Sequence, residues 1–346
     1  MKDIKFAVVG CGKIGTRHAE KLQTVPGAKL VGACDILPER ANAIGEKFNV
    51  KTYTSIENLL QDTEADYINI VTPSGLHAEH AIQALEARKN VLVEKPMALN
   101  EADARRMVEI AKKNNQSLFS VKQNRYNPPI KFAWDLAQSG KLGKPLMAVV
   151  NVYWNRTDEY YRSEPWRGTR AFEKSTIYSQ SSHFGDLLLM FMGEPKRVFS
   201  LMENKTHDIE IDDTAVIAVD FKNGAFGSFN YTMSVAKKNV EGSVALFYEK
   251  GSLKIGGEYL NTIEFFNVED MDSYTLEETP IEANDYGSYR GSASNHQYVF
   301  EAIVRKENGL DDDLTRRLVT GEETIPLIRF FDKAVESAAE KKIVDF

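Results

Sequence analysis

Residues 90–98 read NVLVEKPMA, and this stretch gives the first indication of both the fold and the chemistry. The apolar run Val91–Val93 leads directly into Glu94, Lys95 and Pro96. We interpret it as a buried parallel strand that stops at the proline. Ligands of open α/β sheets bind outside the carboxyl ends of the strands, so Lys95 is expected where a reacting group would lie. The competing interpretation is a solvated lysine that closes a strand.

Upstream, a glycine motif predicts a dinucleotide-binding unit. A strand at Lys5–Val9 precedes GCGKIG at residues 10–15, which opens a helical pattern, and a second strand, Lys29–Cys34, ends at Asp35. In this arrangement the helix N-terminus holds a pyrophosphate and the acidic residue holds the ribose hydroxyls. Asp35 would repel a 2′-phosphate, and the two residues that follow it offer no arginine to hold one. The pattern therefore favours NAD over NADP.

Strands and helices go on alternating to residue 121, which predicts βαβ units and a parallel sheet. The expected helices are Leu37–Phe48, His77–Arg88 and Glu101–Asn115, and the further strands are Asp66–Val71 and Ser117–Val121. Thr72 and Pro73 follow one of these strands, close to the expected dinucleotide crevice. Residues 1–123 are thus predicted to form a Rossmann domain.

The pattern changes after Asn127 to runs rich in β-formers. These runs are Leu146–Tyr153, Ala215–Phe221, Ala225–Thr232, Ser243–Tyr248 and Gly251–Ile255. Asn223-Gly224 between two of them is a hairpin signal. We expect residues 124–324 to form an α/β domain with an open, mostly antiparallel sheet, one face of which is left for a substrate or a partner subunit. Within residues 325–346, the helix Ile325–Glu340 is expected to pack back onto the first domain.

Composition excludes several classes of function. A chain of 346 residues is long enough for two domains, and its net charge of -7 argues against binding to nucleic acid. No apolar run approaches the roughly 20 residues of a membrane helix, and the N-terminus lacks the form of a signal peptide. Cys11 and Cys34 are expected to be buried and lack metal-ligand spacing, so no metal site is predicted. A reducing cytoplasm is the expected location.

Basic residues concentrate in one loop-like stretch together with aromatic residues. The arginines are Arg156, Arg162, Arg167 and Arg170, and the aromatic residues are Trp154, Tyr160, Tyr161 and Trp166. Guanidinium groups bind phosphate or carboxylate, and aromatic faces stack on a base or a sugar. The stretch therefore favours an anionic, ring-containing ligand. A solvated face with ordinary ion pairs to neighbouring acidic residues is the alternative.

His183 is the second candidate catalytic residue. It lies in SQSSHFGD, residues 179–186, at the start of an apolar helix. A lone histidine is more often structural, but with Lys95 it supplies the two groups that hydride transfer from an alcohol requires. The unperturbed histidine pKa of about 6.5 suits a base at neutral pH. We prefer His183 as base and Lys95 as electrophile, and the reverse assignment fits nearly as well.

Five segments resemble the GFO/IDH/MocA group of NAD(P)-dependent sugar oxidoreductases: GCGKIG, DxxxERA from Asp35, TPSGLH, EKPMA and SSHFGDLL. The resemblance covers essentially the whole chain. It implies a Rossmann domain, a C-terminal domain with an open antiparallel sheet, and a homodimer or homotetramer formed through that sheet. It also implies that Lys95 is catalytic and that the Lys95–Pro96 peptide is cis. The cofactor contacts expected are Gly10, Gly12, Lys13, Ile14, Asp35, Thr72, Pro73, His77, Glu94, Lys95 and Gln123.

Further segments are similar to the WlbA/WbpB branch of this group, namely VKQNRYN, NVYWNR, EYY…WRGT, IEIDDT and KNVEGS. The branch oxidises the sugar 3-hydroxyl of UDP-N-acetylglucosaminuronic acid to a 3-keto sugar, in the biosynthesis of bacterial surface polysaccharide such as the lipopolysaccharide O-antigen. The resemblance implies that Arg167 and Lys238 hold the uronate, with Arg125 and Arg156 as further anion contacts. The substrate contacts expected in total are Lys95, Arg125, Tyr153, Arg156, Tyr161, Trp166, Arg167, Ser179, Gln180, His183 and Lys238.

One departure from the branch bears on the substrate. Ser179 stands where the branch has a longer amide or carboxylate side chain, so the contact to the sugar is made through water or the substrate differs. Two alternatives therefore stay open: a dehydrogenase of a free sugar or cyclitol, and a non-catalytic NAD-binding sensor. Since oxidation of the 3-hydroxyl by NAD is unfavourable alone, either NADH leaves the enzyme or a second substrate, such as a 2-keto acid, accepts the hydride in place.

Overall fold

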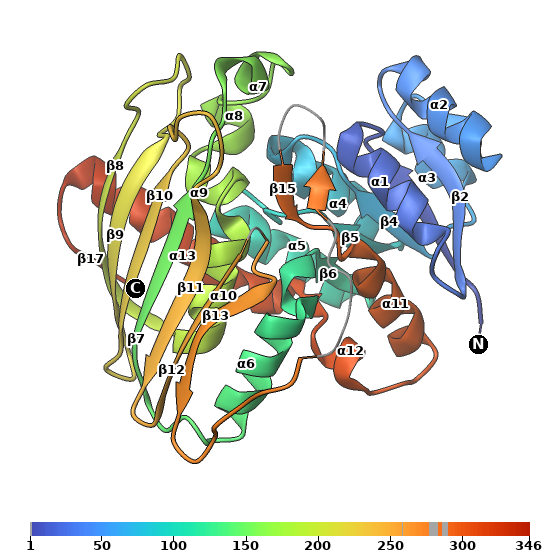
Figure 1. Ribbon diagram of the computed structural model, residues 1–346. Coiled ribbons are helices and arrows are strands. Elements are labelled where there is room, and N and C mark those ends of the chain that lie inside the picture. The colour runs from blue at the N-terminus through green and yellow to red at the C-terminus, as the bar shows by residue number, and fades with distance from the viewer. Residues whose placement is uncertain (1, 258, 277–282, 286–289) are drawn as a thin grey trace. The chain divides into compact units, whose positions relative to one another are not determined.

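Two large β-sheets organise the chain, one in each of two units of the computed structural model (Figure 1). The structure describes residues 2–257, 259–276, 283–285 and 290–346. Unit 1 comprises Met1–Gln123 and His296–Ile328, and unit 2 comprises Asn124–Asn295 and Arg329–Phe346. The first break falls where the sequence placed it, between residues 123 and 124.

Unit 1 is built on a seven-stranded sheet in the order β16-β6-β5-β4-β1-β2-β3. Its parallel strands are β1 (Ile4–Val9), β2 (Ala28–Cys34), β3 (Lys51–Tyr53), β4 (Tyr67–Ile70), β5 (Asn90–Val93) and β6 (Leu118–Ser120), and β16 (Val319–Thr320) adds an antiparallel edge. The chain runs outward from β1 to β3 and then returns to β4 on the other side of β1. This reversal is the switch point where dinucleotides bind in doubly wound sheets.

The helices of unit 1 come from both ends of the sequence. They are α1 (Lys13–Leu22), α2 (Pro38–Phe48), α3 (Ile56–Asp62), α4 (His77–Glu86), α5 (Glu101–Asn114), α11 (His296–Glu307) and α12 (Asp313–Arg316), with the 3-10 turn η1 (Ser74–Leu76) and the first part of α13 (Gly321–Glu340). Helix α11 packs on α1, and the ring of its Phe300 lies 5.5 Å from that of Phe6 in β1. The Tyr67 hydroxyl in β4 also donates to Glu307 of α11 at 2.6 Å.

These contacts correct the sequence-based division of the chain, which placed residues 296–324 in the second domain. The amphipathic pattern of α11 predicts a buried face but does not say which sheet the face covers. In the structure its Val299, Phe300 and Ile303 are buried within unit 1. Helix α11, which begins at His296, therefore belongs to unit 1, the unit that contains the glycine loop.

Unit 2 contains an eight-stranded sheet in the order β13-β12-β11-β7-β10-β9-β8-β17. Its strands are β7 (Pro145–Tyr153), β8 (Pro195–Glu203), β9 (Thr214–Phe221), β10 (Phe226–Thr232), β11 (Glu241–Tyr248), β12 (Gly251–Gly256), β13 (Thr262–Val268) and β17 (Val344–Asp345). Strands β7 and β10 run parallel, and the other described pairings in this sheet are antiparallel, as expected. The predicted Asn-Gly hairpin joins β9 to β10, with Gly224 at a φ of 89°.

One face of this sheet is covered by helices (Figure 1). The helices of unit 2 are α6 (Pro128–Gln138), α7 (Asp158–Arg162), α8 (Arg170–Glu173), α9 (Thr176–Ser179), α10 (Ser182–Met192) and the end of α13, while η2 (Gln123–Tyr126) begins at the break; β14 (Ala283–Asp285) and β15 (Arg290–Ala293) form a small separate sheet. Helix α10 contacts β7, β10 and β11. The sheet thus presents one face to α10 and leaves side chains of the other exposed.

The C-terminal segment also differs from the expectation. Residues 329–346 group with unit 2 rather than packing onto the first domain. The reason is backbone pairing, because β17 extends the unit 2 sheet beside β8, and the Ser200 amide of β8 donates to Ser337 Oγ of α13 at 3.0 Å. Helix α13 also starts earlier than expected, at Gly321.

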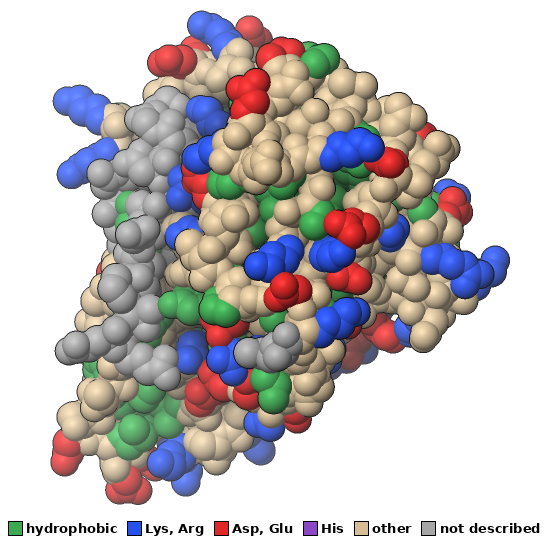
Figure 2. Space-filling view, turned by 90° about the vertical axis from the view of Figure 1, so that its right-hand side faces the viewer, with side chains coloured by type: hydrophobic (Ala, Val, Ile, Leu, Met, Phe, Trp, Pro, Cys, Tyr) green, Lys and Arg blue, Asp and Glu red, His purple; other side chains and the backbone are tan. Residues whose placement is uncertain are grey.

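Charged side chains of both signs lie on the surface that Figure 2 shows. On the face that Figure 2 shows, Lys and Arg side chains of the described residues are interspersed with Asp and Glu, and they form no extended basic surface of the kind that binds nucleic acid. Among the residues that the structure describes, none of the helices has both the length and the apolar character needed to cross a membrane.

Candidate active site

The glycine loop after β1 has the geometry of a phosphate-binding turn. Gly10 has a φ of 98°, and a Cβ there would lie 2.7 Å from the carbonyl carbon and oxygen of Val71. A Cβ at Gly15 would lie 1.9 Å from the carbonyl oxygen of Gly10, so α1 approaches the loop more closely than any side chain allows. Both positions therefore require glycine for reasons of backbone packing.

Gly12 differs from its neighbours, because a Cβ there would meet little of the protein. The nearest atom would be Arg40 Nη1 at 3.9 Å. Gly12 is also the N-cap of α1 and supplies no side-chain cap, and the expected contacts Lys13 and Ile14 form the first turn. The space that glycine leaves at this helix N-terminus fits the close approach of a pyrophosphate to backbone N–H groups.

Asp35 lies at the end of β2, beside this loop. Its Oδ2 accepts a hydrogen bond from the Cys11 amide at 2.7 Å, and its Oδ1 accepts one from the Leu37 amide at 2.9 Å. The carboxylate is thereby fixed next to the glycine loop, and its remaining lone pairs are available to ribose hydroxyls. Arg40 of α2 reaches the same loop and was missed in the sequence. The signal was its place two residues into a helix that opens at Pro38.

The three candidates after β4 differ in their surroundings. Thr72 and Pro73 follow the end of β4 at the switch point, where the Thr72 hydroxyl contacts His80 at 3.1 Å. His77, by contrast, is buried, and its ring nitrogens lie 2.7 Å from the Pro96 carbonyl oxygen and 2.8 Å from that of Thr72. Both polar atoms of its ring are thus engaged with backbone, and its contact with the cofactor stays a prediction. Burial lowers the pKa of this histidine.

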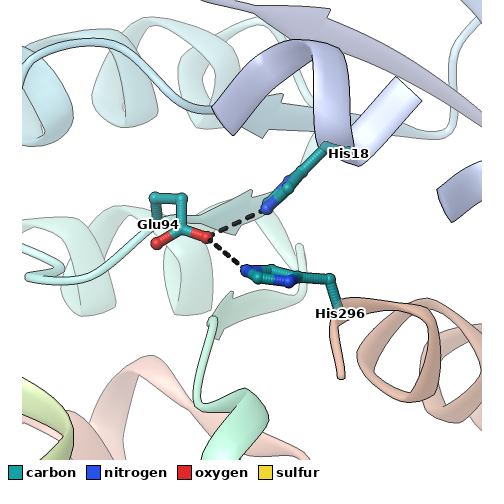
Figure 3. Close-up of side chains that lie close together, drawn as sticks. All are labelled: His18, Glu94 and His296. Carbon is teal, nitrogen blue, oxygen red and sulfur yellow. Dashed lines mark hydrogen bonds and ion pairs between the residues drawn. The ribbon is translucent and has the colours of Figure 1, made fainter. Parts of the chain in front are cut away.

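Glu94 is likewise turned into the interior, where it joins a His–Glu–His cluster with His18 of α1 and His296 of α11 (Figure 3). Glu94 Oε1 lies 2.9 Å from His18 Nε2 and 3.5 Å from His296 Nε2. Burial favours a raised pKa for this carboxyl, but the hydrogen bonds from the two imidazoles hold the pKa well below its usual range. Glu94 thus pairs with side chains of unit 1, and its contact with the cofactor stays a prediction. His296 was not a candidate in the sequence, where nothing links it to residue 94.

Lys95 follows β5 directly, as the sequence predicted. Its backbone amide donates to Glu94 Oε2 at 2.9 Å, and the Lys95–Pro96 peptide is cis, which confirms the expectation from the resemblance. The residue is neither buried nor fully exposed. Gln123, the remaining cofactor candidate, is buried at the end of unit 1.

In unit 2 the structure assembles what we call the arginine–aromatic cluster, consisting of Trp154, Arg156, Tyr160, Trp166, Arg167 and Gln180. The guanidinium carbon of Arg167 lies 4.2 Å from the Tyr160 ring centroid and 4.8 Å from that of Trp166. The corresponding carbon of Arg156 lies 4.8 Å from the Trp154 ring and 5.3 Å from the Tyr160 ring. Guanidinium groups held on ring faces keep their N–H edges in a fixed plane, which suits a carboxylate or phosphate.

Gln180 joins two members of the cluster and lies just before the helix that carries His183. Its Oε1 accepts a hydrogen bond from Arg156 Nε at 2.8 Å, and its Nε2 donates to the Tyr160 hydroxyl at 2.7 Å. Ser179 ends α9 just before it, and His183 lies in the first turn of α10, where its side chain is buried. Arg156, Tyr160 and Gln180 are thus joined by one set of contacts, and His183 follows Gln180 by three residues.

Three buried hydroxyls belong to the same part of unit 2. The side-chain oxygens of Tyr161, Ser181 and Ser182 have no hydrogen-bond partner among the described residues. Since buried polar atoms are nearly always paired, by protein, water or a ligand, such atoms mark a polar site. Tyr161 was a candidate in the sequence, whereas the two serines were seen only as neighbours of His183.

His207, whose side chain is nearly buried, contacts the backbone of Arg156 in the arginine–aromatic cluster, and sequence reasoning missed it. His207 Nδ1 lies 2.8 Å from Asp213 Oδ2, and His207 Nε2 lies 2.7 Å from the carbonyl oxygen of Arg156. Both partners are acceptors, so the ring donates to both only as an imidazolium. The hydrogen bond to Asp213 accordingly raises the pKa of His207. Burial alone would raise the pKa of Asp213, but the bond from His207 and several backbone amides lower it.

Two further substrate candidates have partners within unit 2, and their contacts with a substrate stay predictions. Arg125 makes a two-pronged ion pair with Asp186 of α10, with both N–O distances at 2.8 Å. The Tyr153 hydroxyl donates to Asn151 on the same strand, and this face of β7 is opposite to the buried Val150 and Val152. Because side chains alternate along a strand, Tyr153 lies on the open face of the sheet, away from α10.

The two remaining substrate candidates lie at the margin of the cluster. Trp166 is half-buried and contacts Arg167, as described above. Lys238 is exposed, in the loop that precedes β11. This loop is joined to the segment that follows β7 and carries Arg156, because the Asn155 amide donates to Asn239 Oδ1 at 2.9 Å.

Comparisons with protein families agree with this division of the chain. Residues 4–122 match the family described as an oxidoreductase family with an NAD-binding Rossmann fold. Residues 130–254 match the GFO/IDH/MocA C-terminal domain. A myo-inositol 2-dehydrogenase of Thermotoga maritima is 30% identical over 230 residues, which cover 65% of this chain and 67% of the relative.

Two solved structures are similar over the whole chain. The WlbA dehydrogenase of Bordetella pertussis, in complex with NADH and UDP-GlcNAcA, is 29% identical with a TM-score of 0.88 and covers 100% of this chain and 99% of its own. The WlbA dehydrogenase of Chromobacterium violaceum, in complex with the same two ligands, is 31% identical with a TM-score of 0.89, and the match covers 100% of this chain and 96% of that one.

Proposed function

The chain belongs to the GFO/IDH/MocA family of NAD-dependent oxidoreductases, and from this premise we propose that it oxidises the 3-hydroxyl of a UDP-linked N-acetylglucosaminuronic acid to a 3-keto sugar. NAD is its cofactor. The likeness to two dehydrogenases crystallised with UDP-GlcNAcA supports this choice of substrate. The product would serve the biosynthesis of bacterial surface polysaccharide.

The observation that carries the proposal is the arginine–aromatic cluster. Two guanidinium groups share the ring of Tyr160, at 5.3 Å for Arg156 and 4.2 Å for Arg167. A uronate and a pyrophosphate each need cationic N–H donors, and the rings of Trp154 and Trp166 offer apolar surface to a base or sugar. Buried hydroxyls at Tyr161, Ser181 and Ser182, without partners among the described residues, suit a polyhydroxylated ligand.

The proposed chemistry assigns two polar groups to the reacting hydroxyl. NAD, held at the glycine loop, would supply the hydride acceptor for the sugar carbon, and the hydroxyl proton must leave to a base. In our preferred assignment His183 accepts this proton, while the Lys95 ammonium donates a hydrogen bond to the oxygen as it becomes a carbonyl. The opposite assignment, with Lys95 as base, predicts the same product.

A product assay tests the proposal directly. Purified protein is incubated with NAD and UDP-N-acetylglucosaminuronic acid, with and without a 2-keto acid, and mass spectrometry follows the loss of two hydrogens from the sugar. We expect the 3-keto product, and dependence on the keto acid would identify a cofactor that is reoxidised in place. Binding of NAD and of the UDP-sugar without any product would contradict the proposed reaction and would point to the Ser179 departure or to the sensor alternative.

A dehydrogenase of a free cyclitol or sugar is the second candidate. The observation that favours it is the 30% identity to a myo-inositol 2-dehydrogenase. A free polyol carries no anion, so Arg167→Glu should leave its turnover nearly unchanged, whereas oxidation of the UDP-sugar should be lost. Comparing both substrates on the wild-type protein and this variant separates the two candidates.

We further propose that the open face of the unit 2 sheet forms an interface between two copies of the chain. Met147 of β7 is exposed between Phe226 of β10 and Phe247 of β11, which are its register partners on either side, and both are exposed. Leu201 of β8 and Val216 of β9 form a second exposed pair. Contiguous apolar surface of this kind is typical of subunit interfaces. Sedimentation analysis of the wild type and of Phe226→Lys should show a dimer or tetramer in the first and a smaller species in the second.

A further inference from the structure

The carboxylate of Glu94 is a buried acceptor for three N–H groups of unit 1. Its Oε1 faces His18 Nε2 at 2.9 Å and His296 Nε2 at 3.5 Å, and its Oε2 accepts the backbone N–H of Lys95 at 2.9 Å. The three side chains of the His–Glu–His cluster come from α1, the end of β5 and α11, which lie far apart in the sequence (Figure 3). The backbone of Lys95 is thus joined through a single carboxylate to helices at both ends of the chain.

The second nitrogens of the two imidazoles have different surroundings. His18 Nδ1 lies 2.8 Å from Asn69 Nδ2. His296 Nδ1 is buried and has no partner among the described residues. Burial, the largest influence, lowers the pKa of His296 to about 4. The cluster therefore places the Glu94 carboxylate beside a His296 ring that is neutral at neutral pH.

Two histidines and a glutamate are also a typical set of zinc ligands, and their ligand atoms all lie within 4.8 Å of one another. A metal-bound imidazole directs its other nitrogen, as N–H, at an acceptor. Here His18 faces the amide nitrogen of Asn69, and Glu94 Oε2 is bonded to the Lys95 backbone. These contacts favour a hydrogen-bonded cluster over a metal centre.

We propose that Glu94 is a positioning residue for Lys95, and that His18 and His296 fix its carboxylate so that the Lys95 backbone is held at the end of β5. The proposal rests on the proposed function in one respect, namely that Lys95 acts on the substrate hydroxyl. Glu94 itself touches neither substrate nor cofactor in this scheme. Displacement of a reacting group by about 1 Å can lower a rate about 100-fold, so a firmly held backbone at this position matters for turnover.

Glu94→Gln tests the carboxylate while preserving its shape. The amide of glutamine places an N–H group where one of the oxygens faced a donor, so either the Lys95 amide or the two imidazoles lose their acceptor. We expect kcat to fall about 100-fold with the KM for NAD changed less than about twofold. We also expect faster hydrogen exchange of the backbone amides in a peptide covering residues 94–98, a readout that needs no substrate.

His296 provides a matched pair of variants in case Glu94→Gln folds poorly. His296→Gln keeps an N–H donor near the position of Nε2, whereas His296→Leu removes it. We expect the leucine variant to lose about tenfold in kcat, because a buried hydrogen bond is lost, and the glutamine variant to recover most of this loss. Rescue by glutamine would not be expected if the residue only filled space.

Tyr67→Phe supplies the control for a general loosening of α11. It removes the 2.6 Å hydrogen bond from β4 to Glu307 at the other end of the same helix and leaves the cluster intact. We expect this variant to keep the wild-type kcat and the wild-type exchange at residues 94–98. A similar fall in kcat for Tyr67→Phe and His296→Leu would overturn the proposal, since helix docking alone would then explain both.

The remaining outcomes separate this proposal from the proposed function. If the wild type turns over the UDP-sugar and Glu94→Gln keeps its kcat, positioning by Glu94 is wrong while the function stands. If the wild type gives no product, the function is wrong, and unchanged exchange of residues 94–98 in Glu94→Gln would overturn the positioning as well. Zinc bound at one ion per chain, and lost in Glu94→Gln, would replace the hydrogen-bonded cluster with a metal site.

Discussion

Each unit buries histidine against a carboxylate, but the two arrangements carry different charge. In unit 1 the His–Glu–His cluster pairs the Glu94 carboxylate with His18 and with the neutral ring of His296, whose other nitrogen meets no partner among the described residues. In unit 2 His207 meets an acceptor on both nitrogens, the carboxylate of Asp213 and the carbonyl of Arg156. The contact between histidine and carboxylate is nearly the same, at 2.9 Å for His18 and 2.8 Å for His207.

The comparison shows that burial and the groups facing both ring nitrogens together decide whether a histidine beside a carboxylate is charged. The neutral ring of His296 leaves the Glu94 carboxylate charged, and this carboxylate accepts the backbone N–H of Lys95. The imidazolium of His207 compensates the charge of Asp213 and donates to the carbonyl oxygen of Arg156. Each arrangement supports the segment that carries a proposed functional residue. The difference also predicts opposite responses to pH and different kinetic consequences in the two units.

The largest effect expected is that of Lys95→Ala in unit 1. Because Lys95 is assigned to the reacting hydroxyl, kcat for the UDP-sugar should fall about 1,000-fold. Steady-state kinetics and calorimetric titration of NAD measure the two properties separately, and NAD should still bind with an affinity near that of the wild type. Full activity of the variant would remove Lys95 from the mechanism and with it the proposed purpose of the Glu94 cluster.

The second effect concerns the stability of unit 1 in acid. The pKa of His296 is lowered to about 4 in the folded chain against about 6.5 unfolded, so the neutral ring contributes stability that is complete above about pH 6.5 and is lost as the pH falls toward 4. The shift corresponds to roughly 3 kcal/mol in the free energy of unfolding. Urea titrations at pH 7 and pH 4.5 should show a smaller acid loss for His296→Gln than for the wild type. Equal losses would mean that the ring is protonated in the fold.

The third prediction moves to the arginine–aromatic cluster, where binding rather than turnover should change. Arg167→Lys keeps the charge but loses the planar group that lies on Tyr160 and Trp166. We expect the KM for the UDP-sugar to rise about tenfold with kcat within about threefold, since a stacked, two-pronged contact is worth about 1–2 kcal/mol. A fall in kcat at unchanged KM would place Arg167 in the chemical step and erase the contrast with Lys95.

The smallest effect is expected at His207, with the opposite sign to His296. Because its folded pKa is raised, the imidazolium contributes stability that is fully present below about pH 6.5 and is lost as the pH rises through the raised value. The loss should be about 1 kcal/mol, that of one hydrogen bond, since only one ring nitrogen loses its proton. The free energy of unfolding, measured from pH 6 to pH 9, should fall more for the wild type than for His207→Gln. Parallel curves would contradict the doubly donating ring.

The sequence predicted the nucleotide-binding half of the fold in some detail because its signals are local. The glycine spacing, the acidic end of β2 and the strand that delivers Lys95 all lie where local patterns placed them. The antiparallel sheet and its Asn-Gly hairpin followed from alternation and turn chemistry in the same way. The arginine–aromatic stretch was also evident, because its members lie within a short segment.

What the sequence did not predict depended on long-range pairing. The helix at His296–Glu307 looked like any amphipathic helix, and only its contacts with α1 assign it to unit 1. Arg125 is expected to bind an anion of the substrate, and its ion pair with Asp186, 61 residues away, could not be foreseen. The same holds for the buried partners of His77 and Glu94.

The sequence by itself determined the family, the cofactor-binding loop and the lysine after β5, because these depend on spacings of a few residues that fix backbone geometry. The tertiary structure alone decided the charge state of each histidine, the partner of Arg125 and the joining of Lys95 to α1 and α11 through Glu94. The physical reason is that protonation and pairing of a buried polar group depend on whichever atoms the fold brings within about 3 Å of it, and those atoms come from distant parts of the chain.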